Sequence, residues 1–324
     1  MNKQLSAWKL IAKSLQSTIG VMLLYVLESR GSSPGRQGFF MVVTSSGEMD
    51  GSIGGGIMEH KFVELAKEKL REGNRETTIK KQFHDKLAAT NQSGMICSGE
   101  QTILLYPVTQ KDSAVIQNII QSIEQNMNGS LWLSPGRFSF SSTIPAKNFQ
   151  FSHKSEHNWE YIEKTGFKNQ LFIIGGGHCA LAFSKLMRGM DFYITLFEER
   201  EGLYTLVQNE FAHDVIIVDD YLALANLISS GPNQFTVIMT FGYRSDSIAL
   251  RALLYKKFTY LGILGSKTKM KKLLGEFRKE GIAGDLLKNI YTPIGLTINS
   301  QTPEEIAISI AAEIIKIKNR IAIN

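Results

Sequence analysis

Residues 171–182, LFIIGGGHCALA, decide the fold of the second half of this 324-residue chain. An apolar run leads into consecutive glycines and then into a segment with helical spacing, which predicts a buried strand, a tight turn and a helix. Gly175 and Gly177 let the backbone turn sharply and approach a ligand, and the helix N-terminus offers N–H groups to an anion. We therefore expect a phosphate-bearing ligand at this turn.

A second buried strand is predicted at residues 192–197, FYITLF, and it leads directly into Glu198. Dinucleotide-binding folds place a ribose-binding carboxylate roughly 20 residues beyond the glycine turn, which is where Glu198 lies. Ala180 replaces the last glycine of G-x-G-x-x-G, as the looser form of that motif allows. The candidate binding residues of this half are Gly175, Gly177, His178 and Glu198.

Strand and helix patterns alternate through the rest of the chain. The predicted strands are residues 171–174, 193–197, 214–218, 235–239 and 260–264. Such alternation is typical of a doubly wound parallel sheet of the Rossmann type. We therefore expect an α/β protein with a Rossmann-like domain at residues 169–324.

The length suits about two domains of roughly 150 residues each. Residues 1–150 are predicted as an N-terminal α+β domain that includes 111–150 as its trailing segment. The polar stretch 151–168 is predicted as a linker. The expected elements of the N-terminal domain are an amphipathic helix at the start, strands at 21–29, 39–44 and 101–108, and a helix at 58–71.

Composition excludes several classes of protein. The net charge is +6, but basic and acidic residues are interleaved, which favours anionic small molecules over nucleic acid. The sequence has no apolar run near the ~20 residues of a membrane span, and its first residues lack the apolar core of a cleavable signal. Cys97 and Cys179 are too few for a disulfide framework. We expect a cytoplasmic protein.

Two glycine-rich turns lie close together in the N-terminal half. GSSPGR at 31–36 offers hydroxyls and a guanidinium that suit a phosphate or a polar heterocycle. GSIGGG at 51–56 precedes a predicted helix and could form an anion-accepting nest. Tight structural connections are the alternative interpretation of both turns. Their candidate binding residues are Ser32, Ser33, Arg36, Gly54, Gly55 and Gly56.

Two other segments carry weaker signals. Cys97 lies in a glycine-flanked loop, where its thiol could face a ligand or could be a small buried hydrophobe. Lys267 and Lys269 open a predicted helix, an arrangement that is unfavourable for the helix dipole unless an anion lies nearby. A solvated helix face is the alternative for these lysines.

In their order, these segments resemble the XdhC/CoxI family, accessory proteins that bind molybdenum cofactor and help to mature xanthine dehydrogenase and related molybdenum hydroxylases. The resemblance covers nearly the whole chain. It is carried by GSSPGRQG at 31–38, GSIGGG at 51–56, GMICSG at 94–99, LFIIGGGHCALA at 171–182, LGILGSKTK at 261–269 and the block at 291–314.

The resemblance implies a carrier and insertion factor rather than an enzyme with turnover. Its ligand would be molybdenum cofactor (molybdopterin), its client a xanthine dehydrogenase-type enzyme and its sulfur donor a cysteine desulfurase, with a homodimer as the expected assembly. Cys97 would lie near the metal or its sulfur. The turn at Gly175 to Gly177, with His178, would complete the cofactor site or bind a nucleotide. The polar and anionic parts of the cofactor would be held by Ser32, Ser33, Arg36, Gly54, Gly55 and Gly56.

This chain departs from the family pattern in three places, of which the smallest is Ser98, where the family usually has a glycine in the Cys97 loop. Ile57 stands where the family often has a cysteine after the second glycine loop, so a site with two thiols is not available. Residues 241–244, FGYR, replace histidines that many members carry after the fourth Rossmann strand. These departures bear on whether the sulfurated cofactor is handled in the usual way.

Two other classes of function remain open on the sequence alone. One is an NAD(P)-dependent oxidoreductase acting on a small substrate, in which Glu198 would favour NAD over NADP. The N-terminal half offers no convincing pair of proton donor and acceptor for it, and Rossmann folds host many functions. The other is a docking scaffold without a ligand.

Overall fold

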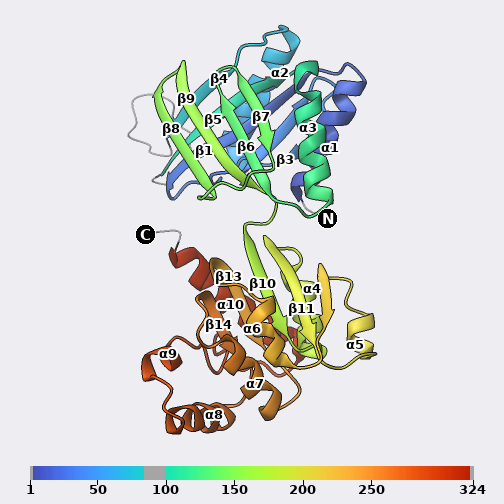
Figure 1. Ribbon diagram of the computed structural model, residues 1–324. Coiled ribbons are helices and arrows are strands. Elements are labelled where there is room, and N and C mark those ends of the chain that lie inside the picture. The colour runs from blue at the N-terminus through green and yellow to red at the C-terminus, as the bar shows by residue number, and fades with distance from the viewer. Residues whose placement is uncertain (1–2, 84–98, 322–324) are drawn as a thin grey trace. The chain divides into compact units, whose positions relative to one another are not determined.

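Two units make up the chain, Met1–Gly166 and Phe167–Asn324 (Figure 1). The computed structural model describes residues 3–83 and 99–321. The first unit is built on antiparallel sheets and the second on a parallel sheet, so the predicted α/β class with a C-terminal Rossmann-like domain is confirmed.

The first unit is organised around strand β1 (Val21–Gly31), which pairs antiparallel with β2 (Phe40–Thr44) and β5 (Gly99–Val108). The full order of this sheet is β3-β2-β1-β5-β4, with β3 at Met49–Gly51 and β4 at Thr78–Phe83. Both faces of β1 are buried because apolar clusters cover each side. Helix α2 (Gly56–Arg71) packs on one face, and α1 (Lys3–Gln16) and α3 (Ser113–Glu124) pack on the other.

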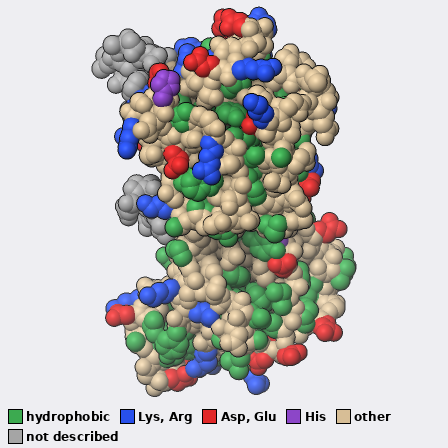
Figure 2. Space-filling view, turned by 45° about the horizontal axis from the view of Figure 1, so that its top comes forward, with side chains coloured by type: hydrophobic (Ala, Val, Ile, Leu, Met, Phe, Trp, Pro, Cys, Tyr) green, Lys and Arg blue, Asp and Glu red, His purple; other side chains and the backbone are tan. Residues whose placement is uncertain are grey.

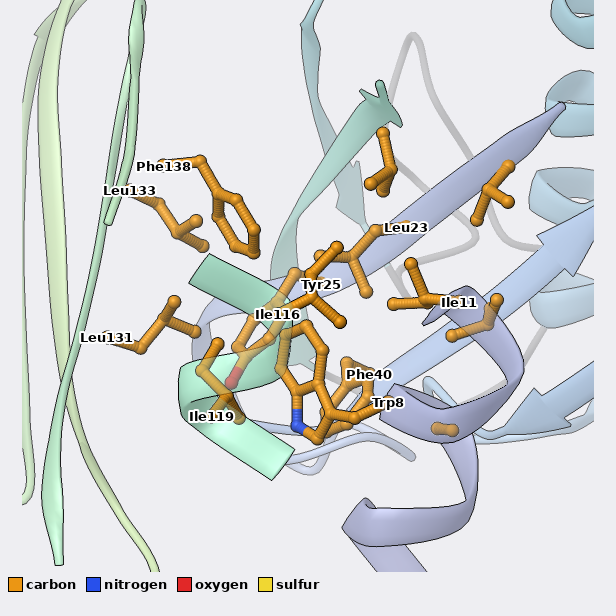
Figure 3. Packing of buried hydrophobic residues seen from close by; sticks show 14 of the residues in the cluster. Trp8, Ile11, Leu23, Tyr25, Phe40, Ile116, Ile119, Leu131, Leu133 and Phe138 are labelled. Carbon is orange, nitrogen blue, oxygen red and sulfur yellow. The ribbon is translucent and has the colours of Figure 1, made fainter. Parts of the chain in front are cut away.

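Figure 3 shows the core on the α1 side of this sheet. The Trp8 ring from α1 lies 5.0 Å from the Phe40 ring and 6.2 Å from the Phe138 ring, measured between centroids. Ile116 and Ile119 of α3, which follows the short helix η1 (Gln110–Asp112), fill the space between. Apolar side chains of two helices and two sheets thus meet in one cluster, which fixes both sheets of the unit in place.

The second sheet of this unit has the order β7-β6-β9-β8. Its strands are β6 (Gly129–Ser134), β7 (Arg137–Ser141), β8 (Phe149–Ser155) and β9 (Asn158–Thr165). The structure differs here from the predicted linker at 151–168, most of which lies in β8 and β9. Trp159 and Tyr161 face the core in alternation with exposed Glu160, so a strand forms in a stretch that is polar on average.

The second unit contains a parallel sheet of order β12-β11-β10-β13-β14. The order reverses between β10 and β13, the topological switch point beside which such sheets bind ligands. The predicted strands are all present, as β10 (Asn169–Ile174), β11 (Phe192–Glu198), β12 (Asp214–Ile217), β13 (Gly231–Ile238) and β14 (Phe258–Ile263).

Helices cover both faces of this parallel sheet, which places one apolar cluster on each side. They are α4 (His178–Met187), α5 (Tyr204–Val207), η2 (Tyr221–Ala223), α6 (Leu224–Leu227), α7 (Tyr243–Leu253), α8 (Lys267–Lys279), α9 (Gly284–Lys288) and α10 (Pro303–Ile321). Helix α10 begins with the predicted capping box: Glu305 N–H donates to Thr302 Oγ1 at 3.3 Å, and Thr302 N–H donates to Glu305 Oε2 at 3.2 Å.

The surface in Figure 2 carries lysine and arginine side chains interspersed with aspartate and glutamate. The positive net charge is therefore not gathered into a single basic patch on this face. Among the described helices, none combines the length and the apolar character needed to cross a membrane.

Candidate functional site

The first glycine-rich loop, residues 31–36, is held by its own hydrogen bonds. Gly31 O accepts from Ser33 N–H and from Arg36 Nη1, both at 3.1 Å. Ser33 is buried and its Oγ donates to Gly35 O at 3.3 Å, whereas Ser32 and Arg36 are exposed. Ser32 and Arg36 can therefore reach a ligand, while Ser33 stabilises the loop.

The two glycine-rich loops of the first unit pack against each other. A Cβ on Gly35 would overlap the Ile53 carbonyl oxygen, and one on Gly54 would overlap the Gly35 amide nitrogen, so both positions require glycine. The buried Gln101 side chain joins the loops, because its Nε2 donates to Gly35 O at 3.0 Å and to Ile53 O at 3.3 Å. The structure thus brings together the two loops that the sequence assigns to one site.

The second loop already holds an anion that belongs to the chain. Glu59 Oε2 accepts from Ser52 Oγ at 2.7 Å, from Ile53 N–H at 2.9 Å and from Gly55 N–H at 3.0 Å. Glu59 lies in the first turn of α2, where a carboxylate is also favoured by the helix dipole. Of the predicted nest, Gly56 is exposed at the start of α2, and the next residue, Ile57, is 59% exposed.

A cavity of about 490 Å³ lies beside the first glycine loop, within the range usual for small-molecule sites. One wall comes from the end of β1 and from Gln37, and the other comes from β8, β9 and the residues before β8. Its lining residues are Glu28, Ser29, Arg30, Gln37, Lys147, Phe149, Gln150, Phe151, Ser152, Glu160 and Ile162.

Charges of both signs line this cavity, but they are not equally engaged. Arg30 Nη2 lies 2.8 Å from Glu28 Oε1, and its Nε lies 3.7 Å from Glu100 Oε1, so this guanidinium is balanced by carboxylates. Lys147 and Glu160 are exposed and form no ion pair with any described residue. The cavity therefore offers one cation and one carboxylate to a ligand, whereas the phenyl groups of Phe149 and Phe151 lie on the core face of β8, opposite Glu163 and Tyr161.

The cavity was not predicted from the sequence, because residues 151–168, which supply part of its lining, were interpreted as a linker. Seven of its eleven lining residues lie in or next to the β8–β9 hairpin, which the polar composition of 147–158 disguises. A signal was present, since Phe149 and Phe151 alternate with polar residues, as do Trp159 and Tyr161.

Behind the cavity wall, β9 turns Tyr161 and Glu163 toward the core. The Glu163 side chain is buried, and its Oε2 accepts from Tyr25 Oη at 2.5 Å and from Tyr161 Oη at 2.7 Å. Burial, and then the nearby Glu163 carboxylate, raise the pKa of both tyrosines, which keeps them neutral donors. These bonds connect β1 to β9, so the two walls of the cavity are tied together by the core behind them.

In the second unit the predicted glycine turn lies at the switch point. Gly175 has a φ of +107° and a Cβ there would overlap Met239 O, so the turn requires glycine between β10 and β13. Gly177 is the N-cap of α4, and His178 is the exposed first residue of that helix. Cys179 is half-buried, and burial followed by the Glu304 charge raises the pKa of its thiol, so it is a poor nucleophile.

Glu198 is placed at the end of β11 as predicted, but it is fully buried and saturated. Its Oε2 accepts from Gly176 N–H at 2.6 Å and from Arg200 Nη2 at 2.8 Å. Its Oε1 accepts from Glu199 N–H at 3.0 Å, Arg200 N–H at 3.1 Å, Arg200 Nε at 2.9 Å and Tyr221 Oη at 3.3 Å. Burial alone would raise the pKa of this carboxyl, but Arg200 and the backbone donors hold it below its usual range.

Asp246, in α7 after β13, is a third carboxylate that occupies an anion position, as Glu59 and Glu198 do. The buried Asp246 pairs with Lys269, and its Oδ1 accepts from Thr240 Oγ1 at 2.6 Å. The anion that Lys269 needs at the start of α8 is therefore supplied by α7, and Lys267 is exposed.

Cys97, the predicted metal-proximal residue, lies outside the described residues. Among those residues, no group of His, Cys, Asp and Glu is arranged to hold a metal ion.

Both units match known sequence families. The profile of the XdhC Rossmann domain matches residues 171–314, and that of the XdhC and CoxI family matches residues 14–80. Uncharacterized protein YqeB of Escherichia coli K12 is 24% identical over 315 residues, which are 95% of this chain and 45% of that protein. A probable xanthine dehydrogenase component of Bacillus subtilis 168 is 26% identical over 163 residues, 50% of this chain and 47% of that protein.

The chain spans about half the length of these curated relatives. Among solved structures, a protein described as a xanthine dehydrogenase from Bacillus halodurans has the same fold. The TM-score is 0.69 at 23% identity, over 97% of this chain and 96% of the other. Since family profiles match segments of both units and their order is that of the predicted motifs, the chain belongs to the XdhC and CoxI family.

Proposed function

We propose that this protein binds molybdenum cofactor, carries it and helps to insert it into a xanthine dehydrogenase-type enzyme. Family membership supports an accessory role of this kind. The observation that carries the binding proposal is the cavity of the first unit. It combines ligand-sized volume with a lysine and a glutamate that no described residue engages in an ion pair.

The residues present fit the chemistry of such a cofactor, which carries a flat pterin, a dithiolene and a phosphate. Lys147 would bind the phosphate as a point charge. Glu160 can accept from ring N–H groups, and Ile162, on the same face of β9 as Glu160, gives the ring system an apolar surface. Ser32 and Arg36, exposed on the adjoining loop, can add donors to the anionic end. These side chains would hold the cofactor by polar contacts at its ends and by burial of its rings.

Charge reversal at the cavity tests this proposal. Lys147→Glu should weaken anaerobic binding of molybdenum cofactor by at least about tenfold, because it replaces a charge-assisted contact with a repulsion. Lys154→Glu is the matched control, since Lys154 is an exposed lysine of β8 that does not line the cavity. Equal affinity of the two variants in equilibrium dialysis would remove the cavity from the cofactor site.

The assembly belongs to the same proposal. A homodimer, a xanthine dehydrogenase-type client and a cysteine desulfurase as sulfur donor are the proposed partners, and light scattering of the purified protein tests the first. A simple NAD-dependent oxidoreductase receives less support, since Glu198 is engaged by the chain itself.

A further inference from the structure

The carboxylate that should meet a ribose in the second unit is bound by a guanidinium two residues away. Arg200 Nε donates to Glu198 Oε1 at 2.9 Å, and Arg200 Nη2 donates to Glu198 Oε2 at 2.8 Å. This is a bidentate pair, with two parallel donors on the two carboxylate oxygens. The 2′ and 3′ hydroxyls of a ribose present the same pattern of adjacent donors to the acidic residue of a dinucleotide fold.

The guanidinium is held at the surface and not in the core. Its central carbon lies 4.6 Å from the centroid of the Phe241 ring, a cation–π contact between the end of β11 and the end of β13. The Arg200 side chain is 37% exposed and Phe241 is 67% exposed. Arg200 can therefore swing into water without opening the apolar core, whereas Glu198 is fixed by Gly176 N–H and Tyr221 Oη beneath it.

The position of this pair matches the place where a nucleotide would enter. Gly176 N–H, one of the donors to Glu198, belongs to the glycine turn itself. Phe241 follows β13, and the carbonyl of Met239, the residue directly after that strand, lies against Gly175 across the switch point. Glu198, Arg200 and Phe241 thus lie together at the carboxyl ends of β10, β11 and β13, at the ligand-binding edge of the sheet.

We propose that Arg200 occupies the ribose subsite of an adenine-nucleotide site in the second unit and acts as an internal substitute for the ribose hydroxyls. A nucleotide with a free 2′,3′-diol, such as NAD, binds only after Arg200 leaves Glu198. A 2′-phosphorylated nucleotide gains nothing from this release, because its phosphate would meet the Glu198 carboxylate. The inference goes beyond cofactor carriage and concerns the second unit alone.

The test measures NAD and NADP binding to the full chain by isothermal titration calorimetry. Arg200→Ala should bind NAD at least about tenfold more tightly than the unaltered protein, since a charge-assisted bidentate contact no longer competes. Arg200→Lys keeps the positive charge but loses the fork, so it should show a smaller gain. NADP affinity should stay low in both variants. Arg278→Ala, at an exposed arginine of α8, is the matched control and should change neither affinity.

A combined Arg200→Ala and Glu198→Gln variant should lose the gain in NAD affinity, because the freed acceptor is then neutral. Arg200→Lys retains a partner for the buried carboxylate, so the comparison holds even where Arg200→Ala folds poorly. The proposal is overturned if Arg200→Lys binds NAD no better than the unaltered protein. It is equally overturned if the affinity for NADP rises as much as the affinity for NAD, because a general loss of rigidity at the site would raise both affinities. Failure here leaves cofactor binding at the cavity of the first unit untouched.

Discussion

His213 is held as a neutral ring by the start of the parallel sheet. Its Nδ1 accepts from Ile194 N–H at 2.9 Å, and its ring lies 4.6 Å from the rings of both Phe167 and Tyr193. Burial, followed by the charge of Arg188, lowers the pKa of His213 to about 4, although the nearby Asp214 acts in the opposite direction. A protonated ring could not accept the hydrogen bond from Ile194 N–H, so this contact also favours the neutral form of His213.

We predict that this histidine makes folding stability depend on pH. The unfolded chain gains a proton at His213 below its ordinary pKa, near 6.5, and the folded chain gains it only near 4. The contribution of His213 to the free energy of unfolding is complete above pH 6.5. It falls by about 1.4 kcal/mol for each pH unit between pH 6.5 and pH 4. Urea unfolding at pH 7 and pH 5 measures it. His213→Gln should show a smaller loss between the two pH values, and an identical loss would contradict the assignment.

Single carboxylates also explain why the candidate site was only partly predictable. The glycine turns were found because their residue types are visible in the sequence, and the structure places them where expected. That Glu59, Glu198 and Asp246 fill the neighbouring anion positions was not predicted, because side-chain direction decides it. Each of these acceptors comes from the chain itself, so donors that suggest a phosphate site from sequence are already partly satisfied.

At the scale of elements, Glu59 at the start of α2 allows a direct test of whether a carboxylate of the chain satisfies the donors of the second glycine-rich loop. Glu59→Ala removes the acceptor of three donors in the second glycine loop, so unfolding free energy should fall by about 1–3 kcal/mol. Glu64→Ala on the same helix breaks only an exposed pair with Lys67 and should lower the free energy of unfolding by clearly less than Glu59→Ala. Chemical denaturation compares the two variants.

Anion rescue sharpens the same prediction. Millimolar phosphate should restore part of the stability of Glu59→Ala, because the vacated N–H groups can then bind a free anion. The unaltered protein and Glu64→Ala should gain less from phosphate. Equal losses in the two variants, with no rescue, would show that Glu59 is not the acceptor that holds this loop.

The elements themselves were largely predictable where apolar periodicity is strong. β1 and the parallel strands were found because continuous apolar runs mark strands buried on both faces. The edge strands β3 and β4 and the β8–β9 hairpin were not found, since they are short or half-exposed. Pairing with a neighbour supplies their stability, and a single segment does not reveal its partner.

At the scale of the whole molecule, the two units carry separate candidate sites. The cavity and both glycine-rich loops belong to the first unit, and the Arg200–Glu198 pair at the switch point belongs to the second. The positive net charge adds a general attraction for anionic ligands without specifying one. Cofactor binding and nucleotide binding can therefore be measured on the same protein and can succeed or fail independently.

The most direct test of the central claim is anaerobic equilibrium binding of molybdenum cofactor to the purified full chain, with NAD and NADP as competitors. We expect stoichiometric binding that neither nucleotide displaces, because the cavity lies wholly in the first unit. Absence of cofactor binding, or its displacement by NAD, would contradict the account.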